Sequence, residues 1–307
     1  MSTSTHLRLH QLRALVAVVD TGSIRAAARA LHLSQAALTK SLRLLEDSAG
    51  LSLLVRKSSG VVLTPAGQRL LVRARLVTRQ IDLADAELRE ATGGAQSTVC
   101  IGLTPYLMLS ALGAAHRGFR TRFPDTRLEV MEGLVSRVLP ALREGSLDFA
   151  IVADSGDIPA KEFATERLSV QPQKIGARVG HPLHRSATAS QLAACEWVIT
   201  RPQGHGTAGD DSLSVLFAQV GLAPPRTVTH CDAMAALSLV RNSDALCLFP
   251  VPLLAEPESR GIKALATTAL QPSDFELVQI SLPDAPLTAP AAWLAHCLRD
   301  ACAQADV

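Results

Sequence analysis

Residues 23–67 read SIRAAARALHLSQAALTKSLRLLEDSAGLSLLVRKSSGVVLTPAG, and this stretch decides how the first part of the chain folds. Ser23 is expected to cap a short, Ala-rich helix, because its side-chain oxygen can accept a hydrogen bond from the first helical turn. His32-Leu33 then makes a turn, and Ser34 caps a further helix that runs to about Asp47. The pattern predicts two helices joined by a tight turn.

A third helix is predicted just upstream of this stretch. Its apolar residues recur at positions i, i+3, i+4 and i+7, which makes one stripe on a helix. These residues are Leu12, Leu15, Val16 and Val19. Thr21-Gly22 is expected to end the helix, so the sequence predicts a three-helix unit.

The helix after Ser34 has two different faces when successive residues advance by about 100°. One face is apolar and suited to packing: Leu38, Ser41, Leu42 and Leu45. The other is polar and cationic: Gln35, Ala36, Thr39, Lys40 and Arg43. A helix of this kind fits the major groove of DNA, where such side chains address base edges or phosphates. On its own, the pattern also fits an ordinary amphipathic surface helix.

The residues that follow read as two short strands around a turn that contains glycine. Leu53 to Lys57 and Val61 to Leu63 are the strands, and Ser58-Ser59-Gly60 is the turn. Because Arg56 and Lys57 lie next to the turn, this hairpin is suited to contact phosphates or the minor groove. The three helices and the hairpin together predict a winged helix-turn-helix.

Charge is distributed unevenly along the 307 residues. Residues 1–80 hold 12 Lys and Arg against 3 Asp and Glu, so they carry +9, whereas residues 81–307 carry −7. A basic segment joined to an acidic remainder predicts a polyanion partner for the basic part alone. The length itself predicts two or three domains.

Composition and motif searches argue against several classes of protein. No 18-residue apolar run and no secretory signal is found, which predicts a cytoplasmic protein without a membrane span. No dinucleotide-binding, Walker or nucleophile-elbow motif is found, which predicts neither an enzyme nor a cofactor. The cysteines lack zinc-site spacing, so we expect reduced thiols and no metal, with a peroxide-sensing pair as the alternative. They are Cys100, Cys195, Cys231, Cys247, Cys297 and Cys302.

About 60 residues, in order, resemble the LysR-type transcriptional regulators. The matching elements are Leu12-x-x-Leu15, Gly22-Ser23, Ala26-Ala27, Leu31, Ser34-Gln35-x-Ala37, Leu45-Glu46, Leu54-x-Arg56 and Leu63-Thr64-x-Ala66-Gly67. The resemblance implies that the third helix enters the major groove of a partly palindromic double-stranded DNA site. The residues expected to contact DNA are Ser23, Ser34, Gln35, Thr39, Lys40, Arg43, Arg56 and Lys57. Two positions depart from the family pattern: Ala36 replaces a Pro, and Leu54 replaces a Phe.

A long helix is predicted after the hairpin, because Thr64-Pro65 forms a helix start and Gly93-Gly94 a stop. Its apolar residues are spaced 4, 3, 4, 3 and 4 apart: Leu70, Ala74, Val77, Ile81, Ala84 and Leu88. This heptad seam predicts a two-chain coiled coil, although a helix packed on its own domain would show the same pattern. The resemblance favours a homodimer that forms a homotetramer, and it adds RNA polymerase as a partner.

The remaining two-thirds alternates β-rich runs with helical stretches, which predicts an α/β fold. The expected strands are Val99 to Leu103, Leu128 to Met131, Leu147 to Val152, Ile175 to Val179, Trp197 to Thr200, Thr227 to Thr229, Leu246 to Val251 and Leu277 to Leu282. The resemblance implies two lobes like those of periplasmic binding proteins, with a cleft for a small-molecule effector. The expected domains are a DNA-binding domain at 7–64, a linker helix at 65–92 and an effector domain at 97–307. Within the effector domain, lobe I covers about 97–168 and 267–307, and lobe II about 169–266.

Effector contacts are expected where strands lead into helices, because free backbone N–H groups there bind anions. The candidates are Thr104, Pro105, Tyr106, Thr200, Arg201, Asp232 and Phe249. Several have simpler explanations: Thr104-Pro105 is a good helix start, Arg201 can face water, and Asp232 can cap a helix. We expect an organic acid or an aromatic effector. The alternatives are a redox-responsive regulator of the same architecture, a solute-binding α/β protein, and an α/β enzyme fused to a DNA-binding head.

Overall fold

A computed structural model describes residues 7–57, 60–91, 97–154, 156, 158–200 and 212–304. The chain divides into two compact units. The first holds residues 1–98 together with 140–148, and the second holds residues 99–139 and 149–307. We describe each unit separately.

The first unit starts with the three predicted helices, α1 (Leu9–Thr21), α2 (Ile24–Ala30) and α3 (Gln35–Ala49). Gly22 ends α1 in the left-handed conformation at φ 67°, which a glycine adopts without steric cost. The Ser23 hydroxyl accepts a hydrogen bond from the Ala26 N–H at 3.5 Å, and the Ser34 hydroxyl accepts one from the Ala37 N–H at 3.1 Å. Both predicted caps are therefore confirmed.

A two-stranded wing follows, with β1 (Leu54–Lys57) antiparallel to β2 (Gly60–Leu63). The Thr64 hydroxyl accepts a hydrogen bond from the Gly67 N–H at 3.0 Å and donates one to the Ser52 carbonyl at 2.9 Å, so it caps the next helix and ties it to the segment between α3 and the wing. A Cβ at Gly67 would lie 2.1 Å from the Leu53 carbonyl oxygen. Only glycine fits at this crossing.

Helix α4 (Pro65–Ala91) is the predicted long helix, and the predicted stop at Gly93-Gly94 lies outside the described residues. Its first half packs on the head, where Ala74 is fully buried. Two ion pairs fix α1 against it, Arg13 to Asp82 at 2.7 Å and Asp20 to Arg75 at 2.5 Å. Because the partner number on α4 falls as the number on α1 rises, the two helices run antiparallel.

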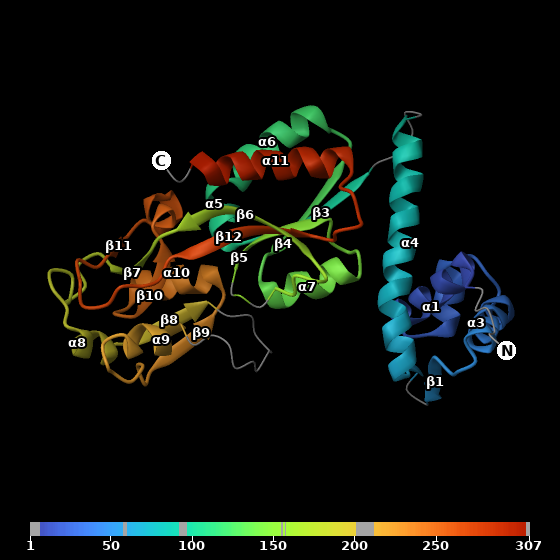
Figure 1. Ribbon diagram of the computed structural model, residues 1–307, viewed down its shortest axis with the longest axis horizontal. Helices are drawn as coiled ribbons and strands as arrows, with labels where there is room; N and C mark the ends of the chain where they lie inside the picture. Colours follow the sequence, from blue (N-terminus) through green and yellow to red (C-terminus); the bar gives the residue numbers. More distant parts are fainter. Residues whose placement is uncertain are drawn as a thin grey trace. The chain divides into compact units, whose positions relative to one another are not determined.

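The second unit contains two five-stranded sheets (Figure 1). The first sheet has the order β4-β3-β5-β12-β6. Its strands are β3 (Thr98–Leu103), β4 (Arg127–Glu132), β5 (Phe149–Ala153), β6 (Ala164–Gln171) and β12 (Phe275–Ser281). Figure 1 shows α6 (Leu112–Arg122) and α11 (Ala289–Gln304) over one face and α7 (Val135–Arg143) over the other. The short helix α5 (Pro105–Ser110) follows β3 directly.

The second sheet has the order β11-β7-β10-β8-β9. Its strands are β7 (Gln173–Arg178), β8 (Trp197–Thr200), β9 (Val228–Cys231), β10 (Leu246–Pro250) and β11 (Ile262–Ala264). The helical elements of this part are α8 (Ala189–Ala193), α9 (Ser212–Ala218), α10 (Ala233–Asn242), η1 (Pro252–Ala255) and η2 (Pro257–Ser259). The fold is therefore mixed, with a winged helix-turn-helix head, a long helix and an α/β part, as predicted.

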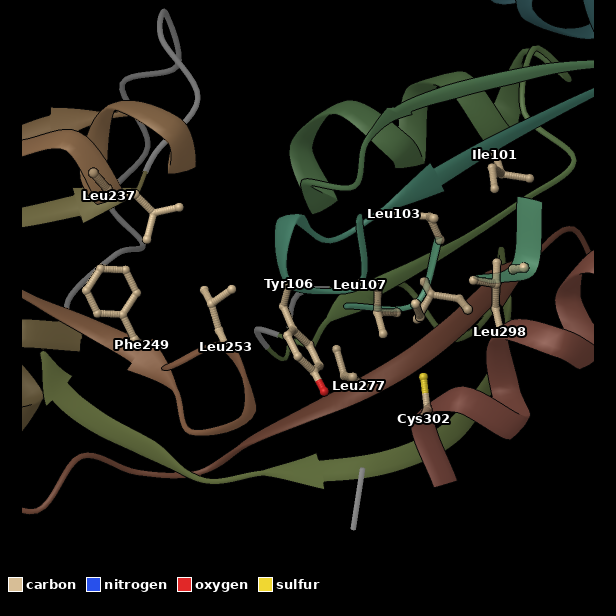
Figure 2. Close-up of a cluster of buried hydrophobic side chains, with 14 of the residues drawn as sticks. Ile101, Leu103, Tyr106, Leu107, Leu237, Phe249, Leu253, Leu277, Leu298 and Cys302 are labelled. Carbon is tan, nitrogen blue, oxygen red and sulfur yellow. The ribbon is translucent and has the colours of Figure 1, made fainter. Parts of the chain in front are cut away.

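The two sheets share one hydrophobic core. Figure 2 shows Phe249 of β10 and Leu253 of η1 lying near Tyr106 of α5, so the core continues from one sheet to the other. The chain crosses between the sheets at Pro172, which lies between β6 and β7, and it returns after β11. Ser169, the expected start of lobe II, pairs with Leu277 in the first sheet.

Two strands were not predicted, β6 and β11. Strand β6 reads ATERLSVQ, and its first half is exposed because only β12 pairs with it. Strand β11 spans only three residues at the other sheet's edge. Edge strands need no apolar alternation, so their sequences lack the signal on which the prediction depended.

Candidate nucleic-acid interface and ligand site

The exposed face of α3 is the first candidate site. Gln35, Ala36, Lys40 and Arg43 are exposed and Thr39 is half-buried, and together these residues line a shallow groove on the helix surface. On the opposite face, Leu38, Leu42 and Leu45 are buried against α1 and α2. The split between a packing face and a polar face is therefore as predicted. It leaves two cations and two hydrogen-bonding side chains on one side of the helix.

The start of α3 is intact although Ala36 stands where the family pattern has a proline. Ser34 adopts an extended backbone at φ −71° and ψ 148°, and its hydroxyl caps the helix. That hydroxyl is thereby engaged with the helix's own backbone. The Ser23 hydroxyl is engaged in the same way at α2.

Glu46 connects α3 to the wing, and sequence reasoning treated it only as part of a motif. Its carboxylate accepts hydrogen bonds from the N–H groups of Leu53 (2.8 Å) and Leu54 (3.1 Å). A carboxylate that accepts two N–H groups fixes the strand's angle to the helix. The backbones of Arg56 and Lys57 pair with Val61 and Gly60 across the wing, but their side chains lie outside the described residues.

The turn at Thr104 is the second candidate site. Thr104 follows β3, its N–H donates to the Ile151 carbonyl at 2.9 Å, and Pro105 begins α5. The Thr104 hydroxyl makes no cap hydrogen bond to α5, although the residue is only 8% exposed. Among the described residues, none hydrogen-bonds this hydroxyl. Capping therefore does not account for a threonine here, and the uncommitted hydroxyl can bind a ligand at this turn.

Gly133 supports this turn, and sequence reasoning gave it no role. Its N–H donates to the Leu103 carbonyl at 2.6 Å. A Cβ here would lie 2.5 Å from the Leu103 carbonyl carbon and 2.8 Å from the Thr104 nitrogen. The available signal was a glycine two residues after the predicted strand Leu128 to Met131, since glycine near a strand often marks a close approach of backbones.

Tyr106 and Phe249 were predicted to contact the effector, but both are core residues. Tyr106 is 4% exposed and packs beside Leu107 and Leu277 (Figure 2). The Phe249 ring fills the space above Gly176, where a Cβ would lie 2.4 Å from the ring. Neither ring is open for stacking on a ligand, because an apolar side chain gains more from the core than from a solvated cleft.

Thr200 and Asp232 lie at the carboxyl ends of the neighbouring strands β8 and β9, which are parallel and in which Thr200 pairs with Cys231. Thr200 is exposed. The Asp232 carboxylate accepts a hydrogen bond from the Ala235 N–H at 2.8 Å and so caps α10, which is the simpler of its two explanations. Arg201 lies outside the described residues.

Four of the six cysteines have thiols with a raised pKa. Burial raises the pKa of the Cys247 thiol to about 12. Burial, followed by a nearby aspartate charge, also raises the pKa of Cys195, Cys231 and Cys297. Thiols with a raised pKa keep their proton at neutral pH and react slowly with oxidants. No disulfide joins any of the six cysteines, all of which are among the described residues.

Metal ligands and membrane spans were also sought in the described part of the chain. No group of three or more His, Cys, Asp or Glu side chains that could hold a metal ion was found there. His181 is buried, and its Nδ1 accepts a hydrogen bond from the Leu183 N–H at 3.1 Å. None of the described helices is long and apolar enough to cross a membrane.

Comparison with known proteins agrees with the geometry of the head and of the α/β part. Residues 9–68 match the bacterial regulatory helix-turn-helix protein, lysR family, and residues 92–303 match the LysR substrate binding domain. The HTH-type transcriptional regulator TdcA of Escherichia coli K12 is 30% identical over 250 residues, which cover 81% of this chain and 79% of TdcA.

Solved structures show the same fold at lower identity. ArgP from Mycobacterium tuberculosis superposes with a TM-score of 0.74 at 22% identity, covering 97% of this chain and 98% of ArgP. Full-length CbnR complexed with its target DNA gives a TM-score of 0.63 at 20% identity, covering 96% of this chain and all of CbnR (100%). The two domain matches cover nearly the whole chain, and this protein therefore belongs to the LysR-type transcriptional regulators.

Proposed function

We propose that this regulator binds a partly palindromic double-stranded DNA site as a homodimer or homotetramer, and that a small organic effector at the Thr104 turn controls this binding or the bending of the DNA. The observation that carries the DNA part is the exposed face of α3, where Gln35, Thr39, Lys40 and Arg43 stand opposite a fully packed apolar face. Arg and Gln side chains pair with base edges in the major groove, and Lys and Arg neutralise phosphates. Ser23 and Ser34 then act by holding helix starts beside the backbone of DNA, and Arg56 and Lys57 act from the wing.

Dimerisation through the second half of α4 follows from where its apolar residues lie. Ala74 is buried in the core of the head, whereas Val77 is 43% and Leu88 70% exposed in the single chain. A second copy of the helix would cover the part of the seam from Val77 onward, which includes Ile81 and Ala84. Two heads would then face two half-sites.

The effector proposal is supported by the Thr104 hydroxyl, which makes no cap hydrogen bond to α5 on a residue that is only 8% exposed. A carboxylate or hydroxyl of the effector would accept or donate there, at a turn that also presents the start of α5. Arg201, beside Thr200, would supply a bidentate partner for a carboxylate. An organic acid fits these groups better than an aromatic ring stacked on Tyr106, because that ring is buried.

The protein acts in this proposal as a binding protein in the cytoplasm, with RNA polymerase as a further partner, and not as an enzyme. The redox-responsive alternative has less support, because burial raises the pKa of four of the cysteines. The solute-binding alternative leaves the basic head without a role.

Selection of duplexes from a random pool with the full-length protein tests the DNA proposal. The wild type is expected to enrich an inverted repeat, and its gel-shift affinity should fall steeply as salt rises, because phosphate contacts release counterions. Enrichment of no motif at any salt concentration would contradict it. A duplex obtained in this way also serves the experiments below.

A further inference from the structure

Arg75 of α4 holds two carboxylates at once. Its Nη2 contacts the Asp20 Oδ1 at 2.5 Å, and its Nη1 contacts the Glu144 Oε2 at 2.5 Å. Asp20 lies in the last turn of α1 in the head, and Glu144 follows directly after α7. Burial lowers the pKa of the Arg75 guanidinium, but the two carboxylates outweigh this and raise it overall. The planar fork of an arginine can serve two partners in fixed directions, which a lysine cannot do.

Further contacts hold residues 140–148 against α4 beside this pair. Arg79 lies 3.6 Å from the largely buried Asp148 carboxylate. Gly145 has φ +70°, and a Cβ there would lie 3.3 Å from the Arg79 side chain and 3.3 Å from that of Leu76. The segment therefore packs along one face of α4 and does not depend on a single ion pair.

The other end of α7 lies at the candidate effector turn. Gly133, two residues before α7, donates its N–H to Leu103 and leaves no room for a Cβ against Thr104, as described above. Val138 and Leu142 of α7 are fully buried, so the helix is held by its packing. Pro140, which removes one helical hydrogen bond, marks the point where α7 passes from the second unit to the first.

We propose that Arg75 is a positioning residue for the DNA-binding head, and that α7 links it physically to the Thr104 turn. This inference rests on the proposed function, since it supplies the route by which an effector at Thr104 would reach the head. A shift of Gly133 moves the first turn of α7. Helix α7 is about 13 Å long. If it moves as one body, Glu144 at its far end is displaced, and the ion pairs of Arg75 then displace Asp20 on α1.

The chain contains a matched control for this route. Arg13 and Asp82 also join α1 to α4, at 2.7 Å, but neither residue contacts the segment 140–148 in the structure's described ion pairs. Asp82→Asn therefore weakens the same helix pair without touching α7. Glu144→Gln removes the α7 arm and leaves the Asp20 arm in place. All these side chains are partly exposed, so the variants are expected to fold.

Amide hydrogen exchange of the full-length protein, read by mass spectrometry, tests the link without DNA or effector. Coupling between two sites is reciprocal, so loss of the contact at Glu144 must be felt at Gly133. We expect peptides covering residues 133–139 to exchange about two- to fivefold faster in Glu144→Gln, the factor that a partly exposed ion pair supplies, and to be unchanged in Asp82→Asn. Unchanged exchange in Glu144→Gln, or equal acceleration in both variants, would overturn the proposal.

Arg75→Lys separates a shared fork from a simple charge. We expect it to accelerate exchange at residues 133–139 as Glu144→Gln does, because the single Nζ of lysine cannot occupy the positions of both Nη1 and Nη2. Wild-type exchange in Arg75→Lys would mean that the two-armed contact is not needed.

A DNA-binding experiment with the duplex selected by the wild-type protein tests the same link by its function. Gly133→Ala must displace backbone at the turn, and we expect it to change DNA affinity. That change should persist in the Asp82→Asn background and disappear in the Glu144→Gln background. Persistence in both backgrounds would contradict transmission through Arg75. If no duplex is bound by any variant, the proposed function fails, while the exchange experiment still decides whether the link exists.

Discussion

Helices α3 and α5 begin alike in sequence but use their first hydroxyl differently. Ser34 and Thr104 each precede a helix and carry an oxygen that can cap it. The Ser34 hydroxyl accepts the Ala37 N–H at 3.1 Å, whereas the Thr104 hydroxyl makes no cap hydrogen bond, although the residue is only 8% exposed. A helix start whose hydroxyl is used locally is explained by the fold, and one whose hydroxyl is left over calls for a partner from outside.

The difference extends to the surroundings of the two helices. The polar side chains on α3 are exposed and lie opposite a packed apolar face, so they form a surface that another molecule can meet. Around α5, Tyr106 and Phe249 are taken up by the core, and the Thr104 hydroxyl is not used to cap the helix. A large polyanion suits the first site and a small molecule suits the second.

The largest expected effect concerns α4, the long helix that we propose brings two DNA-binding heads together. Ile81→Asp puts a carboxylate into the seam that we propose a second copy covers. An unpaired buried charge costs more than the roughly 2–7 kcal/mol of a neutral polar group. Sedimentation should show the wild-type assembly replaced by monomers, and Asp85→Asn on the exposed side of α4 serves as the control. A variant that sediments like the wild type would place Ile81 in an intrachain contact.

Loss of a base contact on α3 should be the next largest effect. Arg43→Ala and Thr39→Ala are each expected to weaken binding to the selected duplex by about 1–3 kcal/mol, because both remove a major-groove partner without touching the core. Gel-shift titrations at fixed salt measure this, and circular dichroism checks that the fold is kept. Wild-type affinity in both variants would exclude this face of α3 from base readout.

The cysteines sharpen the comparison, since the head has none and the remainder of the chain has all six. The pKa of Cys247 is raised to about 12 in the fold, whereas an unfolded thiol titrates near 8.5. The unfolded chain loses this proton first, so stability is complete below about pH 8.5 and falls as pH rises toward 12, by roughly 1.4 kcal/mol per pH unit.

Urea unfolding at pH 8 and pH 10 measures this loss. In Cys247→Ala the fall between the two pH values should be smaller than in the wild type by about 2 kcal/mol, because the loss begins only near pH 8.5. Cys297→Ala, at a half-buried thiol, is the comparison variant. Equal pH dependence in the wild type and Cys247→Ala would show that this thiol does not set it.

The smallest effect compares the two hydroxyls directly. Ser34→Ala removes a cap and should lower the free energy of unfolding by about 1 kcal/mol. Thr104→Val removes a hydroxyl that caps nothing and keeps the side-chain volume, so the change should be close to zero or slightly stabilising. Denaturant titration of both variants measures this. A loss at Thr104→Val as large as that at Ser34→Ala would mean that its hydroxyl is used inside the fold.

The head was predictable from sequence because each of its features is local. Ser23, Ser34 and Thr64 cap helices within three residues, and Gly22 ends one, so neighbouring residues alone carry the signal. The two faces of α3 follow from helix periodicity. Glu46 was recognised only as part of a motif, because its partners lie seven and eight residues away in the wing.

The candidate ligand site was less predictable because it depends on contacts between distant segments. Gly133 meets Leu103, and Phe249 meets Gly176, across long stretches of chain. The sequence offered a helix cap as one explanation of Asp232, and the structure shows that cap, but the sequence could not show that Tyr106 and Phe249 are buried. Burial is set by the whole fold, whereas caps are set by neighbours.

The central claim is that α3 and the Thr104 turn bind different partners, and one paired experiment tests it most directly. Arg43→Ala and Thr104→Val are each measured for affinity to the selected duplex and for the change in Tm with a library of small carboxylic acids. We expect Arg43→Ala to lose DNA affinity and keep the Tm rise that an acid gives the wild type, and Thr104→Val to keep DNA affinity and lose that rise. Loss of DNA affinity in Thr104→Val, or a Tm rise equal to that of the wild type, would contradict the account.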